Sequence, residues 1–188
     1  MTTAGSDDFW VFGYGSLMWQ PGFPHTAAVP AVLRGYHRAF CVYSHHYRGT
    51  PEHPGLVLGL ARGGSCRGLA FRVEPAREAA VRAYLDEREL TGYAYQPRTV
   101  PVSTDAGTVV SAYTFVADPR HPLYAGERSV DEAAAIIVDA IGAAGLNRDY
   151  LINTVRRLER EGFVDRHLHT LLKRVEGLTG VLDAGGGI

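Results

Sequence analysis

The sequence predicts an α+β protein whose mainly antiparallel sheet curls toward a small barrel with flanking helices. Three observations lead to this fold class. Short apolar and aromatic runs dominate the first half of the chain, one helical pattern follows at residues 75–90, and the last third is helical. Strands and helices do not alternate regularly, which argues against a doubly wound parallel sheet.

The expected strands combine β-branched and aromatic residues and are bounded by Pro, Gly and Ser. Before the first helix they cover residues 10–17, 31–36, 38–44, 56–61 and 66–73. Two more extended segments, 95–103 and 108–117, follow that helix. Because these runs are short and separated by turn-forming residues, we expect separate strands joined by tight connections.

The first helix is predicted at residues 75–90, with Pro75 in its first turn and Gly92 beyond its end. Three further helices are predicted at 129–141, 148–162 and 165–178. Ser129 and Glu132 have the spacing of a capping box at the start of the first of these three.

Composition indicates a single domain over residues 1–188, with residues 1–8 and 184–188 loosely held. The chain has 19 basic and 20 acidic side chains, a net charge of −1, which supplies no basic field for nucleic acid or membrane surfaces.

The polar N-terminus lacks an apolar signal-peptide core. Two cysteines, Cys41 and Cys66, form no disulfide framework, so a cytoplasmic location is expected. The sequence leaves the oligomeric state open.

The stretch FGYGSLMW, residues 12–19, places two glycines around Tyr14 at a strand end. Ser16 and Leu17 are expected in the turn that leaves this strand. Successive backbone N–H groups in such a turn form a concavity that binds an anion such as a carboxylate. The alternative is a glycine-containing bulge that only bends the strand.

A second candidate is the acidic helix end YLDERELTGY, residues 84–93. Glu89 follows the apolar position Leu85 by four residues and is expected to point inward, whereas Asp86 and Glu87 rotate toward solvent. Partial burial and the negative helix end both raise the pKa of such a carboxyl group, which suits it to proton transfer near neutral pH. Arg88 lies on nearly the same face, so a structural Arg–Glu ion pair is the alternative.

The histidines do not have the spacing of a metal site. His45, His46 and His53 lie in a loop-like segment, and His167 and His169 are two residues apart on a predicted helix, where they face different ways. The sequence therefore predicts no bound metal. Cys41 lies in a strand-like run and is interpreted as a small hydrophobic residue.

Two motifs in this order resemble those of the ChaC-like γ-glutamylcyclotransferases. WVFGYGSLMWQPGF at 10–23 resembles the opening motif of that family, and AYLDERELTGY at 83–93 resembles its YLDxRE helix. The likeness continues in Arg48-Gly49, Pro54-Gly55, GLAFRV at 68–73 and GAAGLNRDYL at 142–151. It spans roughly residues 10–175.

The resemblance implies a γ-glutamylcyclotransferase-like fold and the roles of several residues. The turn Tyr14, Gly15, Ser16 and Leu17 would hold the γ-glutamyl group, and Glu89 would be the catalytic acid and base. Tyr113 and Tyr150 match tyrosines that recur in the family and are expected in the pocket, with buried structural tyrosines as the alternative.

The implied reaction is cyclisation of a γ-glutamyl group to 5-oxoproline by a lyase that uses neither metal nor cofactor. The expected substrate is glutathione, which would release cysteinyl-glycine. Relatives acting on glutathione often have Trp-Gln-Gly-Ser where this chain has Cys41-Val42-Tyr43-Ser44. Two alternatives stay open: cyclisation of other γ-glutamyl peptides or γ-glutamylamines, and a catalytically silent module that binds γ-glutamyl ligands.

Overall fold

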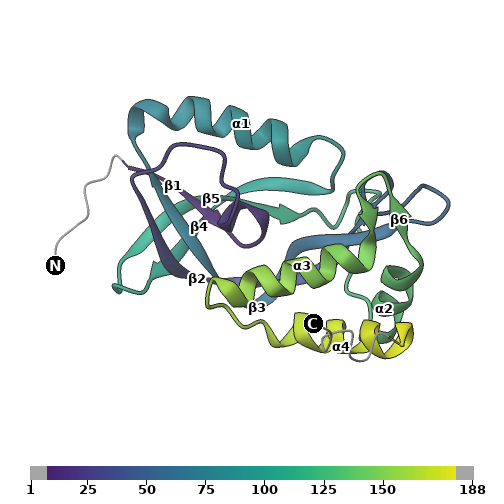
Figure 1. Ribbon diagram of the computed structural model, residues 1–188. Coiled ribbons are helices and arrows are strands. Elements are labelled where there is room, and N and C mark those ends of the chain that lie inside the picture. Colours follow the sequence, from purple (N-terminus) through teal and green to yellow (C-terminus); the bar gives the residue numbers. More distant parts are fainter. Residues whose placement is uncertain (1–7, 181–188) are drawn as a thin grey trace, which may run out of the picture. The chain divides into compact units, whose positions relative to one another are not determined.

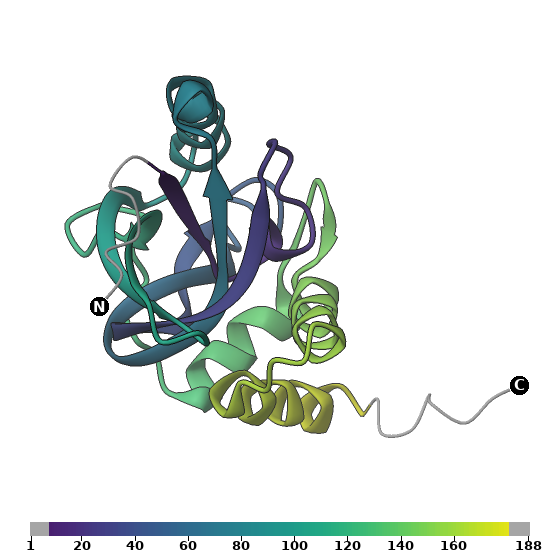
Figure 2. The same ribbon diagram turned by 90° about the vertical axis from the view of Figure 1, so that its left-hand side faces the viewer.

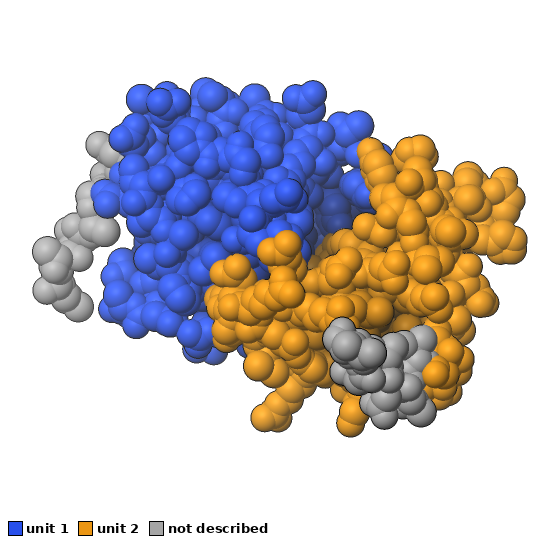
Figure 3. Space-filling view, viewed as in Figure 1, with its two compact units in different colours: residues 1–37, 60–118 blue, residues 38–59, 119–188 orange. Residues whose placement is uncertain are grey.

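The computed structural model describes residues 8–180, which divide into two compact units. The first unit comprises residues 1–37 and 60–118, and the second comprises residues 38–59 and 119–188, coloured blue and orange in Figure 3. The prediction of a single domain over 1–188 stays a prediction. Of the segments expected to be loose, residues 1–7 and 184–188 lie outside the described residues, whereas Asp8 forms an ion pair with Arg72 at 2.6 Å.

The first unit is built on a closed five-stranded barrel with the strand order β1-β3-β2-β4-β5. The strands of the barrel are β1 (Phe9–Gly13), β2 (Ala27–Ser44), β3 (Gly55–Val73), β4 (Tyr95–Thr104) and β5 (Val109–Ala117). Residues 38–44 of β2 and 55–59 of β3 belong to the second unit. β1 is antiparallel to β3 and parallel to β5, and this parallel pairing closes the barrel. Together with the helices, this architecture confirms the predicted α+β class with a sheet curled into a barrel.

Two apolar clusters form the core of this unit. One contains Phe12, Leu33, Leu60, Val100 and Ala112 together with further residues, so that all five strands contribute to it. The other lies between the barrel and helix α1 (Glu78–Leu90), which packs over one face of the strands (Figures 1 and 2). Alternate residues of β1 belong to the two clusters, as the two-residue repeat of a strand requires.

The predicted helices are present, with small shifts at their ends. A short 3-10 helix, η2 (Pro75–Arg77), carries Pro75 and leads directly into α1. The second unit contains α2 (Val130–Asp139), α3 (Asn147–Arg160) and α4 (Arg166–Thr179), which pack against one another, and the two-residue strands β6 (Ile141–Gly142) and β7 (Gly145–Leu146). Ser129 and Glu132 form the predicted capping box of α2. No helix of the described chain is long and apolar enough to cross a membrane.

Three predictions about the strands were wrong. Residues 31–36 and 38–44 belong to one strand, β2, and residues 56–61 and 66–73 belong to one strand, β3. Gly63 and Gly64, which have positive φ and lie between the two segments predicted for β3, are within that strand instead of ending it. The first strand ends at Gly13, so residues 14–17 are not part of it.

Candidate active site

The chain turns sharply after β1, and the short helix η1 (Ser16–Met18) follows. Gly13 permits this fold-back, because a Cβ atom there would lie 3.1 Å from Cβ of Leu17 and 3.2 Å from the ring of Phe71. Leu17 is buried in the cluster beneath α1, and Tyr14 packs against the barrel cluster. The packing of Leu17 fixes the turn on the barrel.

The backbone N–H groups of this turn are only partly used. The N–H of Met18 donates to the carbonyl oxygen of Gly15 at 2.9 Å, and that of Gln20 donates to the carbonyl oxygen of Ser16 at 2.8 Å. Within residues 8–180, the N–H groups of Gly15, Ser16 and Leu17 donate no hydrogen bond. Three consecutive backbone donors are therefore available to an acceptor, as a concavity of the predicted kind requires.

Glu89 lies in the last turn of α1, four residues after the buried Leu85. Its side chain is 19% exposed, which agrees with the predicted inward direction. Burial raises the pKa of its carboxyl group, and the positive charge of Arg88 offsets part of that rise. Within the described chain, the carboxylate accepts no hydrogen bond and its one ion pair is with Arg88, at 3.3 Å.

Arg88 connects Glu89 to the turn. Its guanidinium group donates to Oγ of Ser16 at 3.0 Å and to the carbonyl oxygen of Gln20 at 2.7 Å. It also donates to the hydroxyl of Tyr84 at 3.0 Å. The Arg–Glu ion pair considered from the sequence is thus present, and the same arginine brings the turn and the carboxylate together.

The other two acidic side chains of this helix differ in their surroundings. Glu87 is exposed, as predicted. The prediction that Asp86 faces solvent was wrong, because its carboxylate accepts a hydrogen bond of 2.6 Å from the hydroxyl of the buried Tyr113. Asp86 is the first residue after Leu85, and a long partner on β5 reaches it there.

Tyr113 itself is largely occupied by structural contacts. Besides its bond to Asp86, its ring packs 4.4 Å from the guanidinium carbon of Arg82. Burial and the neighbouring carboxylate of Asp86 raise the pKa of its hydroxyl to about 12. Tyr113 therefore stays protonated near neutral pH, and its expected contact with substrate stays a prediction.

Tyr150 lies on α3 in the second unit. Its hydroxyl accepts a hydrogen bond from the N–H of Leu58 at 3.3 Å, and the guanidinium group of Arg48 lies 5.3 Å from its ring centre. Neighbouring motif residues are also tied into this unit: the side chain of Asn147 bonds both the N–H and the carbonyl oxygen of Leu56, each at 2.8 Å. A pocket role for Tyr150 stays a prediction.

Neither the cysteines nor the histidines form a reactive cluster in the described part of the chain. Cys41 and Cys66 are buried free thiols. Burial and the charge of Glu127 raise the pKa of the Cys41 thiol to about 12, so it is not a thiolate at neutral pH. No group of three or more His, Cys, Asp or Glu side chains among residues 8–180 is arranged to hold a metal ion.

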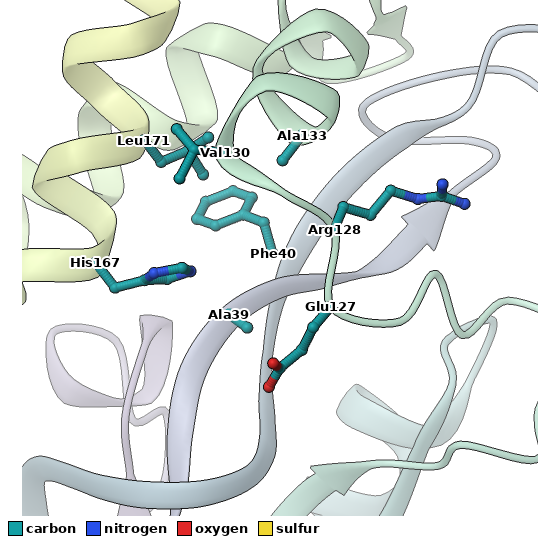
Figure 4. Close-up of a pocket in the computed structure, with 8 residues that line it drawn as sticks. All are labelled: Ala39, Phe40, Glu127, Arg128, Val130, Ala133, His167 and Leu171. Atoms are coloured by element: carbon teal, nitrogen blue, oxygen red, sulfur yellow. The ribbon is translucent and has the colours of Figure 1, made fainter.

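A cavity of about 50 Å³ lies in the second unit (Figure 4). Figure 4 shows Phe40 pointing toward Val130 and Leu171, with the side chain of Arg128 directed away. Sites for small organic ligands usually measure about 300–1,000 Å³. This cavity is too small for a tripeptide, and it contains none of the predicted site residues: it is lined by Ala39, Phe40, Glu127, Arg128, Val130, Ala133, His167 and Leu171.

The model of the ChaC-like protein family matches residues 9–178. This chain belongs to the ChaC-like family. Among its curated relatives, the glutathione-specific gamma-glutamylcyclotransferase of Escherichia coli is 37% identical over 169 residues, which cover 90% of this ChaC-like chain and 73% of the relative. Gamma-glutamylcyclotransferase 2-3 of Arabidopsis thaliana is 33% identical, with 88% and 87% of the two chains covered.

Solved structures support the same fold for this ChaC-like chain. The crystal structure of the gamma-glutamyl cyclotransferase specific to glutathione from yeast superimposes with a TM-score of 0.80. The two sequences are 23% identical, and the match covers 92% of this chain and 97% of the yeast chain. The γ-glutamylcyclotransferase-like fold that the sequence motifs implied is therefore confirmed.

Proposed function

We propose that this chain is a γ-glutamylcyclotransferase that converts glutathione to 5-oxoproline and cysteinyl-glycine. Membership of the ChaC-like family and the names of its relatives support this activity. The structural observation that carries the proposal is that Arg88 contacts both the largely buried carboxylate of Glu89 and Ser16 in the turn with unused N–H donors. We place the reaction in the cytoplasm, as the cysteine content led us to expect.

The reaction needs one new bond and breaks one. The α-amino nitrogen of the γ-glutamyl group attacks the carbon of the γ-amide carbonyl, which closes a five-membered ring. The bond from that carbon to the nitrogen of the cysteine residue then breaks. Ionised Glu89 accepts a proton from the attacking nitrogen and returns it to the leaving nitrogen. No water is consumed, because the nucleophile is the amine of the substrate itself.

The turn performs the second task of the reaction. A tetrahedral intermediate places negative charge on the former carbonyl oxygen, and preorganised backbone donors stabilise such an oxyanion. The free N–H groups of Gly15, Ser16 and Leu17 are the donors that we assign to this role, with Tyr14 flanking the γ-glutamyl group. None of these steps requires a metal ion or a cofactor.

Product analysis tests this proposal. Purified protein is incubated with glutathione, and 5-oxoproline and free cysteinyl-glycine are measured, with a γ-glutamylamine in a parallel reaction. Equal amounts of both products from glutathione are expected. If only the γ-glutamylamine yields product, the substrate is a γ-glutamyl compound other than glutathione. If glutathione binds in calorimetry but yields no product, the chain is a catalytically silent binding module.

A further inference from the structure

Arg88 contacts several polar groups, whereas an ordinary surface ion pair joins one cation to one carboxylate. Its guanidinium group contacts the hydroxyls of Ser16 and Tyr84, the carbonyl oxygen of Gln20 and the carboxylate of Glu89, all between 2.7 and 3.3 Å. A weaker contact of 3.4 Å reaches the carbonyl oxygen of Pro21. The side chain is only 24% exposed, so solvent screens these contacts less than at a fully exposed site.

Another arginine of α1 shows the contrast. Arg82 pairs with Glu78 four residues earlier at 2.8 Å, and its guanidinium carbon lies over the rings of Phe9 and Tyr113. Those contacts hold the helix on the barrel and do not involve the turn. Arg88 is the arginine whose partners include both parts of the candidate active site.

We propose that Arg88 is a positioning residue, which holds the Ser16 turn and the Glu89 carboxylate in one fixed arrangement for the reaction. This inference rests on the proposed cyclotransferase activity. A planar guanidinium group presents five donors in a rigid fork, whereas a lysine ammonium presents three donors at one point. Only the fork can contact the hydroxyl, the carbonyl oxygens and the carboxylate together.

Arg88 also supplies the positive charge beside Glu89. Arg88 is the charged group that acts on the Glu89 carboxylate, and the loop at 16–21 carries no titratable side chain. The hydrogen bond between Tyr113 and Asp86 does not involve Arg88. Loss of the charge would therefore raise the pKa of Glu89, while a lysine would keep the charge and lose the fork.

The two effects can be separated with Arg88→Lys, Arg88→Gln and Ser16→Ala. We measure kcat and KM for glutathione from about pH 5 to about pH 9, together with thermal unfolding. Arg77→Gln is the matched control, because Arg77 is exposed and lies on η2, before α1 begins. It should match the wild type in all three measurements.

Arg88→Lys should lower kcat/KM about 10- to 100-fold, the effect expected of a misplaced catalytic group, and leave the rise of activity with pH in place. Arg88→Gln should lower kcat/KM at least as much and shift that rise to higher pH. Ser16→Ala should lower kcat/KM without moving the pH profile. It keeps the proposal testable if Arg88→Gln fails to fold.

Wild-type kcat/KM in Arg88→Lys and Ser16→Ala would overturn the proposal. So would an Arg88→Gln variant that unfolds at lower temperature with unchanged kcat/KM and pH profile, because that result indicates a purely structural role. Absence of 5-oxoproline with the wild-type protein would instead refute the proposed activity, and the inference would fall with it.

Discussion

At the scale of single residues, the direction of Glu89 follows from helical spacing alone. Val81 and Leu85 form the buried stripe of α1, and Glu89 continues it one turn later. The same spacing failed for Asp86, because a contact with Tyr113 depends on β5, which is distant in sequence. The contacts of Arg88 could not be predicted from the sequence either, because three of its partners lie in the loop at 16–21, far from Arg88 along the chain.

The raised pKa of Glu89 predicts how stability depends on pH. Because the pKa is higher in the folded protein than in the unfolded chain, the folded state holds this proton more tightly. The corresponding stabilisation is fully present below the unfolded-state pKa and is lost as pH rises through the folded-state pKa. Glu89→Gln removes this titration. We therefore expect the variant to gain stability relative to the wild type as pH is raised from about 4 to about 8.

Urea unfolding at a series of pH values measures this difference. Glu87→Gln serves as the control, and its stability should run parallel to that of the wild type because Glu87 is exposed. A Glu89→Gln difference that stays constant with pH would contradict the raised pKa.

At the scale of elements, signals that act within a few residues were reliable. The Ser129–Glu132 capping box and the glycine after α1 predicted helix ends correctly, because each signal satisfies or ends a local hydrogen-bond pattern. The ends of the strands were harder to predict from the sequence. A glycine with positive φ occurs both in turns and in bulges, so Gly63 and Gly64 gave no indication that β3 continues through them. The partner strand decides between the two.

Substitution of Gly22 tests how closely the loop before β2 packs against α1. Gly22 has φ of +72°, and a Cβ atom there would lie 2.1 Å from the hydroxyl oxygen of Tyr84. Gly22→Ala should cost about 1–2 kcal/mol for the backbone conformation. Displacement of Tyr84 from Arg88 should add about 1 kcal/mol.

Gly107→Ala is the matched control, because Gly107 has φ of +80° with no atom within 4 Å of the added Cβ. Denaturant unfolding should show the backbone effect alone in this variant. In a Tyr84→Ala background, Gly22→Ala should cost no more than Gly107→Ala does. If Gly22→Ala and Gly107→Ala lower the free energy of unfolding equally in the wild-type background, the loop does not pack closely against Tyr84.

At the scale of the whole molecule, the fold class was predictable and the closure of the barrel was not. The order of strands and helices along the chain limits the architecture to α+β. The parallel pairing of β1 with β5 joins strands that are about a hundred residues apart, as between Trp10 and Ala112, and no local pattern marks it. Hydrophobic periodicity did not indicate that the turn and Glu89 belong to one site. The resemblance to the family motifs did, because it implied a role for both.

Metal dependence is a property of the whole reaction. If cyclisation needs only proton transfer and oxyanion stabilisation, exhaustive chelation should leave the rate of 5-oxoproline release unchanged. The assay compares protein before and after dialysis against a chelator. Loss of activity that added zinc restores would contradict this expectation and bring His45, His46 and His53 forward as ligands.

We propose that Glu89 transfers the proton during cyclisation of glutathione, and the rate of 5-oxoproline release by Glu89→Gln measures this role. This substitution keeps the shape of the side chain and removes its ability to accept a proton. We predict a rate at least about 100-fold below that of the wild type, with calorimetric binding of glutathione retained and with Glu87→Gln close to wild type. Release of 5-oxoproline by Glu89→Gln at the wild-type rate would contradict the claim.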